Sequence, residues 1–225
     1  MKHAYDRAVY ATLALVGLLV LGLVVGAYSQ TSRQAARDEH LQDFFPSLPI
    51  TEHRDGRADA PLQLFVYFDT DCPFCTRFHR STLTELKRRY KDELAVSYIY
   101  FPLRSHPNAF GEALLAECAA KIGGEEYFWP AIDLLLKIAL PNKLPSPADI
   151  DAFAATLELP TAPLSLCVAD KTTANRIYRD IQDGILRDVS GVPTIIVAAN
   201  NQQEMLATAN ILKLQPVIDR LYRIH

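Results

Sequence analysis

The distribution of apolar positions divides the chain into a long N-terminal apolar segment and a mixed domain. Residues 8–28 contain no charged side chain, whereas residues 62–68 and 94–101 are short apolar runs rich in valine, isoleucine and aromatic residues. Residues 76–90, between these two runs, are predicted to form a helix, with basic residues at its C-terminal end. The domain is therefore predicted to begin strand, helix, strand.

The next ninety residues or so show little strand character and are predicted to be all-helical. Helices are expected at 109–122, where Gly123-Gly124 ends the helix, and at 127–140. A third helix is expected to begin after Ser146, which caps it, with Pro147 at the first helical position. The segment 163–189 is expected to form one or two further helices. A strand then follows at 194–198, a possible edge strand near 206–208 and a final helix at 212–223. This order predicts an α/β fold in which a helical insertion at about 108–188 interrupts the sheet.

The apolar segment at residues 8–28 is long enough to cross a bilayer. A helix of this length would extend about 31 Å, close to the thickness of the hydrocarbon core. The alternative is a cleaved signal peptide, for which residues 25–27 are the best cleavage site, but the apolar run is longer than usual for one. We expect an uncleaved single-pass transmembrane anchor at 1–28, a tether at 29–50 and a folded domain at 51–225.

The length of the chain limits the number of domains, and its net charge limits the kinds of partner. A chain of 225 residues accommodates one domain with an insertion or two small domains. The net charge is −3 and no basic block is present, so nucleic acid is not an expected partner.

The most informative motif is Cys72-Pro73-Phe74-Cys75, which directly follows the first predicted strand and opens the first helix. This position places Cys72 at a helix N-terminus, where free backbone N–H groups and the helix dipole stabilise a thiolate. Cys75 lies one turn further on and can close onto Cys72, so the pair can exchange two electrons with the cysteines of another protein.

Two other roles for the motif are weaker. A C-x-x-C pair is half of a zinc site, but Cys118 and Cys167 are isolated and no paired histidines complete the ligand set, so no metal is expected. A purely structural bridge between Cys72 and Cys75 would close too small a loop to stabilise the fold much. Disulfides also persist outside the cytoplasm, which places the domain on the extracytoplasmic side of the cell (inner) membrane.

A second motif, Gly191-Val192-Pro193-Thr194, leads into the predicted strand at 194–198. Pro193 is a candidate for a cis peptide bond. An ordinary proline at the start of a strand is the alternative, and this motif alone does not exclude it.

Together, C-P-F-C after an apolar strand, the segment at 101–109 and G-V-P-T before a strand resemble the DsbA-like branch of thiol–disulfide oxidoreductases, especially its membrane-anchored bacterial forms. The resemblance covers about residue 51 to the C-terminus and implies a thioredoxin-like fold with an all-helical insertion. It implies that Cys72 is the nucleophile and Cys75 the resolving cysteine. Pro193 would be a cis-proline facing them, and the peptide-binding residues would be Pro73, Phe74, Val192 and Pro193.

The same resemblance implies a structural disulfide between Cys118, at the start of the insertion, and Cys167, near its end. Two buried free thiols are the alternative.

Two positions depart from the family pattern. Phe74 stands where the strongest oxidases of the family carry histidine, and Val66 stands where relatives place a buried carboxylate. Asp69 and Asp71 are closer to the motif, and either could substitute for that carboxylate, but turn and helix-capping roles suit them better. His106 could lie near the active-site face, but a loop histidine hydrogen-bonded to backbone is the favoured interpretation.

The sequence therefore predicts a membrane-tethered, extracytoplasmic, monomeric thiol–disulfide oxidoreductase that favours disulfide formation. Its partners would be unfolded or partly folded cysteine-containing proteins, with no cofactor beyond the Cys72–Cys75 disulfide, and the family resemblance implies a membrane reoxidant of the DsbB or VKOR type. A reductase or isomerase fed by a membrane electron carrier, or a non-catalytic peptide-binding chaperone, are the alternatives.

Overall fold

The computed structural model describes residues 22, 48–49, 53–138, 140 and 143–222. The predicted anchor and tether lie outside these residues apart from Gly22, Leu48 and Pro49. No helix in the part that the structure describes combines the length and apolar character that a membrane crossing requires. The chain divides into two units, Met1–Leu48 and Pro49–His225, and the second unit contains the fold described below.

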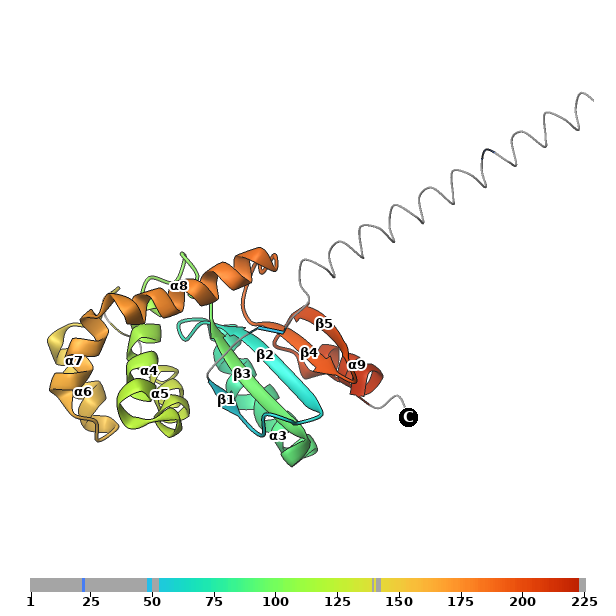
Figure 1. Ribbon diagram of the computed structural model, residues 1–225, viewed down its shortest axis with the longest axis horizontal. Helices are drawn as coiled ribbons and strands as arrows, with labels where there is room; N and C mark the ends of the chain where they lie inside the picture. Colours follow the sequence, from blue (N-terminus) through green and yellow to red (C-terminus); the bar gives the residue numbers. More distant parts are fainter. Residues whose placement is uncertain (1–21, 23–47, 50–52, 139, 141–142, 223–225) are drawn as a thin grey trace, which may run out of the picture. The chain divides into compact units, whose positions relative to one another are not determined.

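A five-stranded sheet forms the centre of the domain, in the order β1-β3-β2-β4-β5 (Figure 1). Strand β2 pairs in parallel with β3 and antiparallel with β4. Almost every residue of these three strands is buried, as expected for strands covered on both faces. The strands are β1 (Arg54–Asp55), β2 (Leu62–Phe68), β3 (Leu94–Tyr100), β4 (Thr194–Ala199) and β5 (Gln202–Ala207).

The edge strand β5 begins earlier than its sequence suggests. A strand was expected only near residues 206–208, whereas β5 starts at Gln202 and pairs with β4 over its whole length. Asn200 and Asn201 form the tight turn between them, both with positive φ (51° and 59°), as a two-residue hairpin turn requires. Because the strand starts with exposed polar residues, no apolar run marks it.

Helices cover both faces of the sheet. On one face α3 (Thr84–Tyr90) lies beside α9 (Ile211–Tyr222), where Gln215 Nε2 donates to the Tyr90 hydroxyl at 2.5 Å. On the other face α8 (Lys171–Leu186) runs from the helical insertion across the sheet, as Figure 1 shows. Tyr67 of β2 donates a 2.5 Å hydrogen bond to Asp183 of α8, which fixes this helix to the central strand.

The helical segment after Cys72 starts at Pro73, three residues before the predicted start at Thr76. Proline fits the first turn of a helix because its missing N–H has no partner to lose there. The segment consists of α2 (Pro73–Arg77), a π-helical stretch (Phe78–Leu83) and α3, so its middle is wound more widely than one uniform helix.

The predicted insertion is helical. The helix at Ser146 is confirmed, with a capping box in which Ser146 and Asp149 bond reciprocally. The helix predicted at 127–140 ends sooner, at Leu135, and the segment at 163–189 is divided by Asp170, which caps α8 through Thr172 N at 2.9 Å. The helices are α4 (Ala109–Gly123), α5 (Phe128–Leu135), α6 (Pro147–Thr156), α7 (Thr161–Ala169) and α8.

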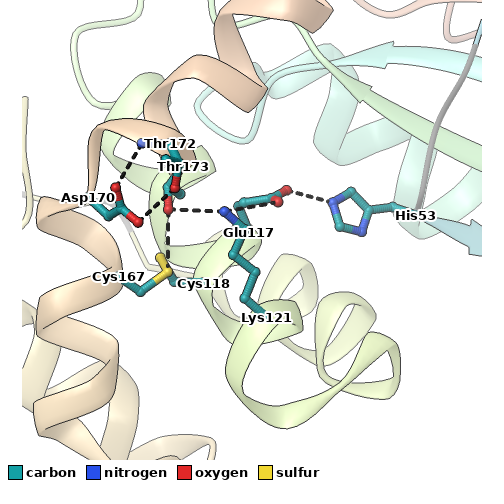
Figure 2. The surroundings of a disulfide bond; sticks show 8 residues. All are labelled: His53, Glu117, Cys118, Lys121, Cys167, Asp170, Thr172 and Thr173. Atoms are coloured by element: carbon teal, nitrogen blue, oxygen red, sulfur yellow. Dashed lines mark hydrogen bonds and ion pairs between the residues drawn. A yellow bond between two sulfur atoms is a disulfide. The ribbon is translucent and has the colours of Figure 1, made fainter.

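A disulfide joins two helices of the insertion. Cys118 of α4 is bonded to Cys167 of α7, 49 positions later in the chain. Figure 2 shows polar groups beside this bond: Lys121 Nζ donates to Thr173 Oγ1 at 3.2 Å, and His53 Nε2 lies 2.8 Å from Glu117 Oε2. The disulfide pairing that the family resemblance implied is thus the pairing present in the structure.

Candidate active site

Cys72 occupies the N-cap position of the helical segment that starts at Pro73. The Cys72 sulfur accepts hydrogen bonds from the Cys75 thiol and from the backbone N–H groups of Cys75 and Phe74. These donors lower the pKa of Cys72 from 9.0 to about 6, although burial opposes the charged form. Cys72 is therefore largely a thiolate at neutral pH when the pair is reduced.

Cys75 has the opposite electrostatic character. Its side chain is 0% exposed, and burial raises the pKa of its thiol far above the usual range. The hydrogen bond that Cys75 donates to Cys72 and the negative charge of the Cys72 thiolate act in the same direction. The two cysteines thus differ: Cys72 holds the charge and Cys75 holds the proton.

The peptide bond between Val192 and Pro193 is cis, as the sequence motif suggested. The sulfur of Cys72 lies 3.7 Å from the Val192 carbonyl oxygen, so this loop borders the cysteine pair although it is 120 positions away in the chain. Because Pro193 has no N–H, this residue brings no backbone donor to the cysteines. The two motifs identified in the sequence therefore form one site.

Apolar and basic side chains surround the opening of this site. The Phe74 ring is 55% exposed, and the Arg77 guanidinium carbon lies 5.6 Å from its centroid. A cleft of about 650 Å³ is lined by residues that include Phe74, Val192 and Pro193. Pro73 is exposed beside Phe74, so the predicted peptide-binding residues share one surface. Cys118 and Cys167 lie apart, in the insertion.

Asp69 and His106 also belong to this site, which the sequence analysis gave only as the less favoured alternative for each. The Asp69 carboxylate is buried and accepts hydrogen bonds from Asp71 N, Leu103 N and His106 Nδ1, each at 2.8 Å. The carbonyl of Asp69 accepts from Cys72 N at 3.3 Å. The expectation that His106 bonds backbone through its side chain is therefore wrong. Asp69 acts in the turn, as expected, but Cys72 occupies the cap position of the helix.

The electrostatic effects of this pair extend to Cys72. Burial raises the pKa of Asp69, and the hydrogen bonds that it accepts moderate this effect. Burial works against the charged form of His106, but the Asp69 carboxylate outweighs it and raises the pKa of His106. The Asp69 charge disfavours the Cys72 thiolate and the His106 cation favours it, so the effects of these two charges on the pKa of Cys72 partly cancel. Residues 37 positions apart give no spacing signal, which is why the sequence did not reveal the pair.

No group of three or more histidine, cysteine or carboxylate side chains is arranged to bind a metal ion in the residues that the structure describes. The reactive groups that the site does contain are the two thiols and their donors.

Several solved structures resemble this chain over most of its length. Pseudomonas aeruginosa DsbA2 is 26% identical with a TM-score of 0.65, over 79% of this chain and 98% of that protein. BdbD from Bacillus subtilis is 18% identical with a TM-score of 0.62, over 75% and 91% of the two chains, and shares the fold.

Curated relatives match over part of their length. The Na⁺/H⁺ antiporter NhaA 3 of Salinispora tropica is 34% identical over 68% of this chain and 22% of its own length, and NhaA 1 of Mycolicibacterium gilvum is 28% identical over 75% and 27%. The chain thus spans about a quarter of the length of these relatives.

The family described as Thioredoxin matches residues 49–218, which include the cysteine pair, the insertion and the cis-proline loop. With this match and the structural likeness to DsbA2, the chain belongs to the thioredoxin family and has the fold of its DsbA-type thiol–disulfide oxidoreductases.

Proposed function

We propose that this protein is a disulfide-forming oxidase of unfolded or partly folded cysteine-containing proteins. The observation that carries the proposal is the difference between the two cysteines: the pKa of Cys72 is lowered to about 6, and that of Cys75 is raised. A stabilised Cys72 thiolate stabilises the reduced pair, and a pair that is stable when reduced is oxidising as a disulfide.

The reaction follows from this geometry. A substrate thiolate attacks the Cys72 sulfur of the disulfide, which releases Cys75, and Cys75 takes up a proton. A second substrate thiolate then attacks the substrate sulfur of the mixed disulfide and releases Cys72 as a thiolate. Two electrons pass from the substrate to the pair, and the substrate leaves with a disulfide. The low pKa of Cys72 makes it the better leaving group in the second step.

Two alternatives use the same fold. A reductase or isomerase would need the pair kept reduced by a membrane electron carrier, and a stabilised Cys72 thiolate disfavours reduction of substrates. A peptide-binding chaperone would need no cysteine asymmetry. The depressed pKa of Cys72 therefore favours the oxidase over both.

The cellular setting is part of the proposal. Residues 8–28 would anchor the protein in the cell (inner) membrane and place the domain on the extracytoplasmic side, where a quinone-linked membrane protein of the DsbB or VKOR type would reoxidise the pair. No further cofactor would be needed. Membrane-purified protein that retains Met1 or Lys2 supports the anchor, and a mature start near Tyr28 contradicts it.

Equilibration of the full chain with glutathione tests the direction of electron flow. We expect a Cys72–Cys75 reduction potential above about −200 mV, on the oxidising side of the reductases. The oxidised protein should also convert a reduced dithiol peptide to its disulfide with one-to-one stoichiometry, and Cys72→Ser should not. A potential near that of thioredoxin, about −270 mV, contradicts the oxidase and favours the reductase.

A further inference from the structure

The cleft beside the cysteines is positively charged. Its volume is about 650 Å³, and its charged lining residues are Arg77 and Lys213, with no carboxylate among the lining side chains in the described residues. Arg77 follows Cys75 by two positions, and Lys213 lies in the first turn of α9, so two separate elements each contribute a cation. The rest of the lining is apolar or neutral.

Several other basic side chains of the domain are held in ion pairs. Lys87 pairs with Asp55, Arg176 with Asp180 and Arg220 with Glu204. Arg77 and Lys213 are exposed and form no ion pair with any of the residues that the structure describes. The nearest aromatic contact of Arg77 is Phe74, 5.6 Å from the guanidinium carbon to the ring centroid. Their charges are thus available to a ligand in the cleft.

The position of the cleft fits a bound peptide. The mixed disulfide attaches the substrate at Cys72, next to Val192, and Val192 also lines the cleft. Arg77 follows Cys72 by five helical positions, about 7 Å along the axis, and an extended peptide covers that distance in about two residues. The side chains two or three positions from the substrate cysteine therefore reach Arg77, and Lys213 lines the same cleft.

We propose that this cleft selects protein segments that carry aspartate or glutamate within about three residues of the reacting cysteine, with Arg77 and Lys213 as the specificity-determining residues. This inference rests on the proposed oxidase function. Exposed charge pairs are weak and screened by salt, so the selection should be modest and should depend on ionic strength. The occupant is an extended, acidic, cysteine-containing segment, and basic segments are disfavoured.

Three dithiol peptides test the inference. They share one sequence except for the residues beside one cysteine, which are aspartate, serine or lysine. The oxidised full chain is mixed with each reduced peptide, and single-turnover rates are followed by acid quenching and chromatography. At low salt we expect the aspartate peptide to react about tenfold faster than the lysine peptide, with the difference shrinking at high salt.

Charge reversal supplies the decisive comparison. Arg77→Glu and Lys213→Glu should each reduce the aspartate-to-lysine rate ratio by about tenfold, to about one, because each reversal replaces an attraction with a repulsion, and the double variant should invert the ratio. The ratio is the readout because any change in Cys72 reactivity affects all peptides alike and cancels. Lys171→Glu, the same reversal at the exposed start of α8 and outside the cleft, should leave the ratio unchanged.

The outcomes separate the two proposals. Equal rates for all three peptides at low salt overturn the charge selection and leave the oxidase intact. No oxidation of the serine peptide overturns the oxidase itself. A ratio that Lys171→Glu changes as much as Arg77→Glu also overturns the cleft as the origin, because a long-range field would then account for the selection. If the double variant does not fold, the single variants and the salt dependence of the unaltered protein decide.

Discussion

At the scale of single residues, the two cysteines should be chemically distinguishable. Carboxymethylation of the reduced protein should modify Cys72 first, with a rate that rises through an inflection near pH 6, because the thiolate is the reacting form. Cys75 should react far more slowly, since it is buried and its pKa is raised. Peptide mapping after brief alkylation measures both.

Serine variants provide the functional counterpart. Cys72→Ser and Cys75→Ser should both abolish oxidation, because neither can form the Cys72–Cys75 disulfide. With a substrate that already contains a disulfide, the Cys72 thiolate of Cys75→Ser should attack one sulfur, release the other as a thiolate and remain in the mixed disulfide, because Cys75 is no longer present to displace it. Faster alkylation of Cys75 than of Cys72 in the unaltered protein would reverse the assignment of nucleophile and resolver.

His106 should support the Cys72 thiolate. Its cation offsets the Asp69 carboxylate, which otherwise disfavours a charge on the Cys72 sulfur. His106→Gln keeps a hydrogen-bond donor for Asp69 but removes the cation, so the alkylation inflection of Cys72 should move above pH 6 and the pair should become less oxidising.

Arg104→Gln is the matched control, because it removes an exposed cation from the same loop. The same displacement of the inflection in Arg104→Gln would show that loop charge in general, rather than the bond to Asp69, sets the pKa of Cys72.

Much of this site could be predicted from the sequence, because C-P-F-C and G-V-P-T are contiguous motifs whose chemistry is local. The bond between Asp69 and His106 could not be predicted, since it joins two loops that only the folded sheet brings together. Val66 shows that a residue role known in relatives does not always apply to the matching position of this chain. It is fully buried in β2, so any carboxylate that influences the cysteines has to come from elsewhere, and Asp69 is one that does.

At the scale of elements, α8 should depend on the absence of a side chain at Gly184. A Cβ atom there would lie 2.5 Å from the Phe101 ring and 3.2 Å from the Tyr67 ring, both closer than ordinary contact. Gly184→Ala gains about 1 kcal/mol of helix propensity but overpacks the interface, and we expect a net loss of about 2 kcal/mol in the free energy of unfolding. Gln182→Ala, at an exposed position of the same helix, is the control for propensity. Chemical denaturation measures both, and a more stable Gly184→Ala variant would contradict the close packing.

The Cys118–Cys167 disulfide should stabilise the insertion by restricting the unfolded chain. In the chain-entropy treatment, closing a loop of 49 residues contributes about 4 kcal/mol. Cys118→Ala combined with Cys167→Ala should lower the free energy of unfolding by up to about that amount without changing the glutathione equilibrium of Cys72 and Cys75. Thiol titration of the fully oxidised, denatured protein should give no free thiol, and two free thiols in this experiment would contradict the bond.

The bounds of some elements could be predicted from the sequence, and those of others could not. The bounds of β2 are those of its apolar run, because a buried central strand is apolar at nearly every position. The exposed start of β5 and the π-helical stretch Phe78–Leu83 left no such pattern. The start of β5 is set by its pairing with β4 across the two-residue turn. Local periodicity therefore identifies the core elements and leaves the edges to tertiary structure.

At the scale of the whole domain, a buried charge cluster joins the start of the domain to the insertion. His53 is 2% exposed and stacks on Phe128 at a centroid distance of 3.8 Å. Its two ring nitrogens face carboxylates, Nε2 to Glu117 at 2.8 Å and Nδ1 to Glu125 at 3.1 Å (Figure 2 shows the first contact). A ring that donates to a carboxylate at each nitrogen is the imidazolium, so the cluster is held together by a buried cation.

The stability of the domain should therefore depend on pH through His53. Burial disfavours the charged ring, but the two carboxylates outweigh it and raise the pKa of His53 above 6.5. A pKa that is higher in the folded state gives a contribution that is complete below the unfolded pKa and is lost as pH rises through the folded value. His53→Gln should cost about 3 kcal/mol near pH 6, because it removes the hydrogen-bonded cation of buried Glu117 and leaves only the longer contact with Lys121 at 3.9 Å, and less near pH 9.

Urea unfolding of the oxidised protein at a series of pH values between 6 and 9 tests this, with the Cys72–Cys75 disulfide intact so that neither thiol titrates. His79→Gln is the matched control: His79 also bonds a carboxylate, Asp133, but burial lowers its pKa, so its neutral form is favoured and the cost of its replacement should not decline as pH rises. A cost for His53→Gln that is constant or larger at pH 9 would mean that the ring is neutral in the folded protein, and the cluster would then owe its stability to stacking on Phe128 rather than to charge.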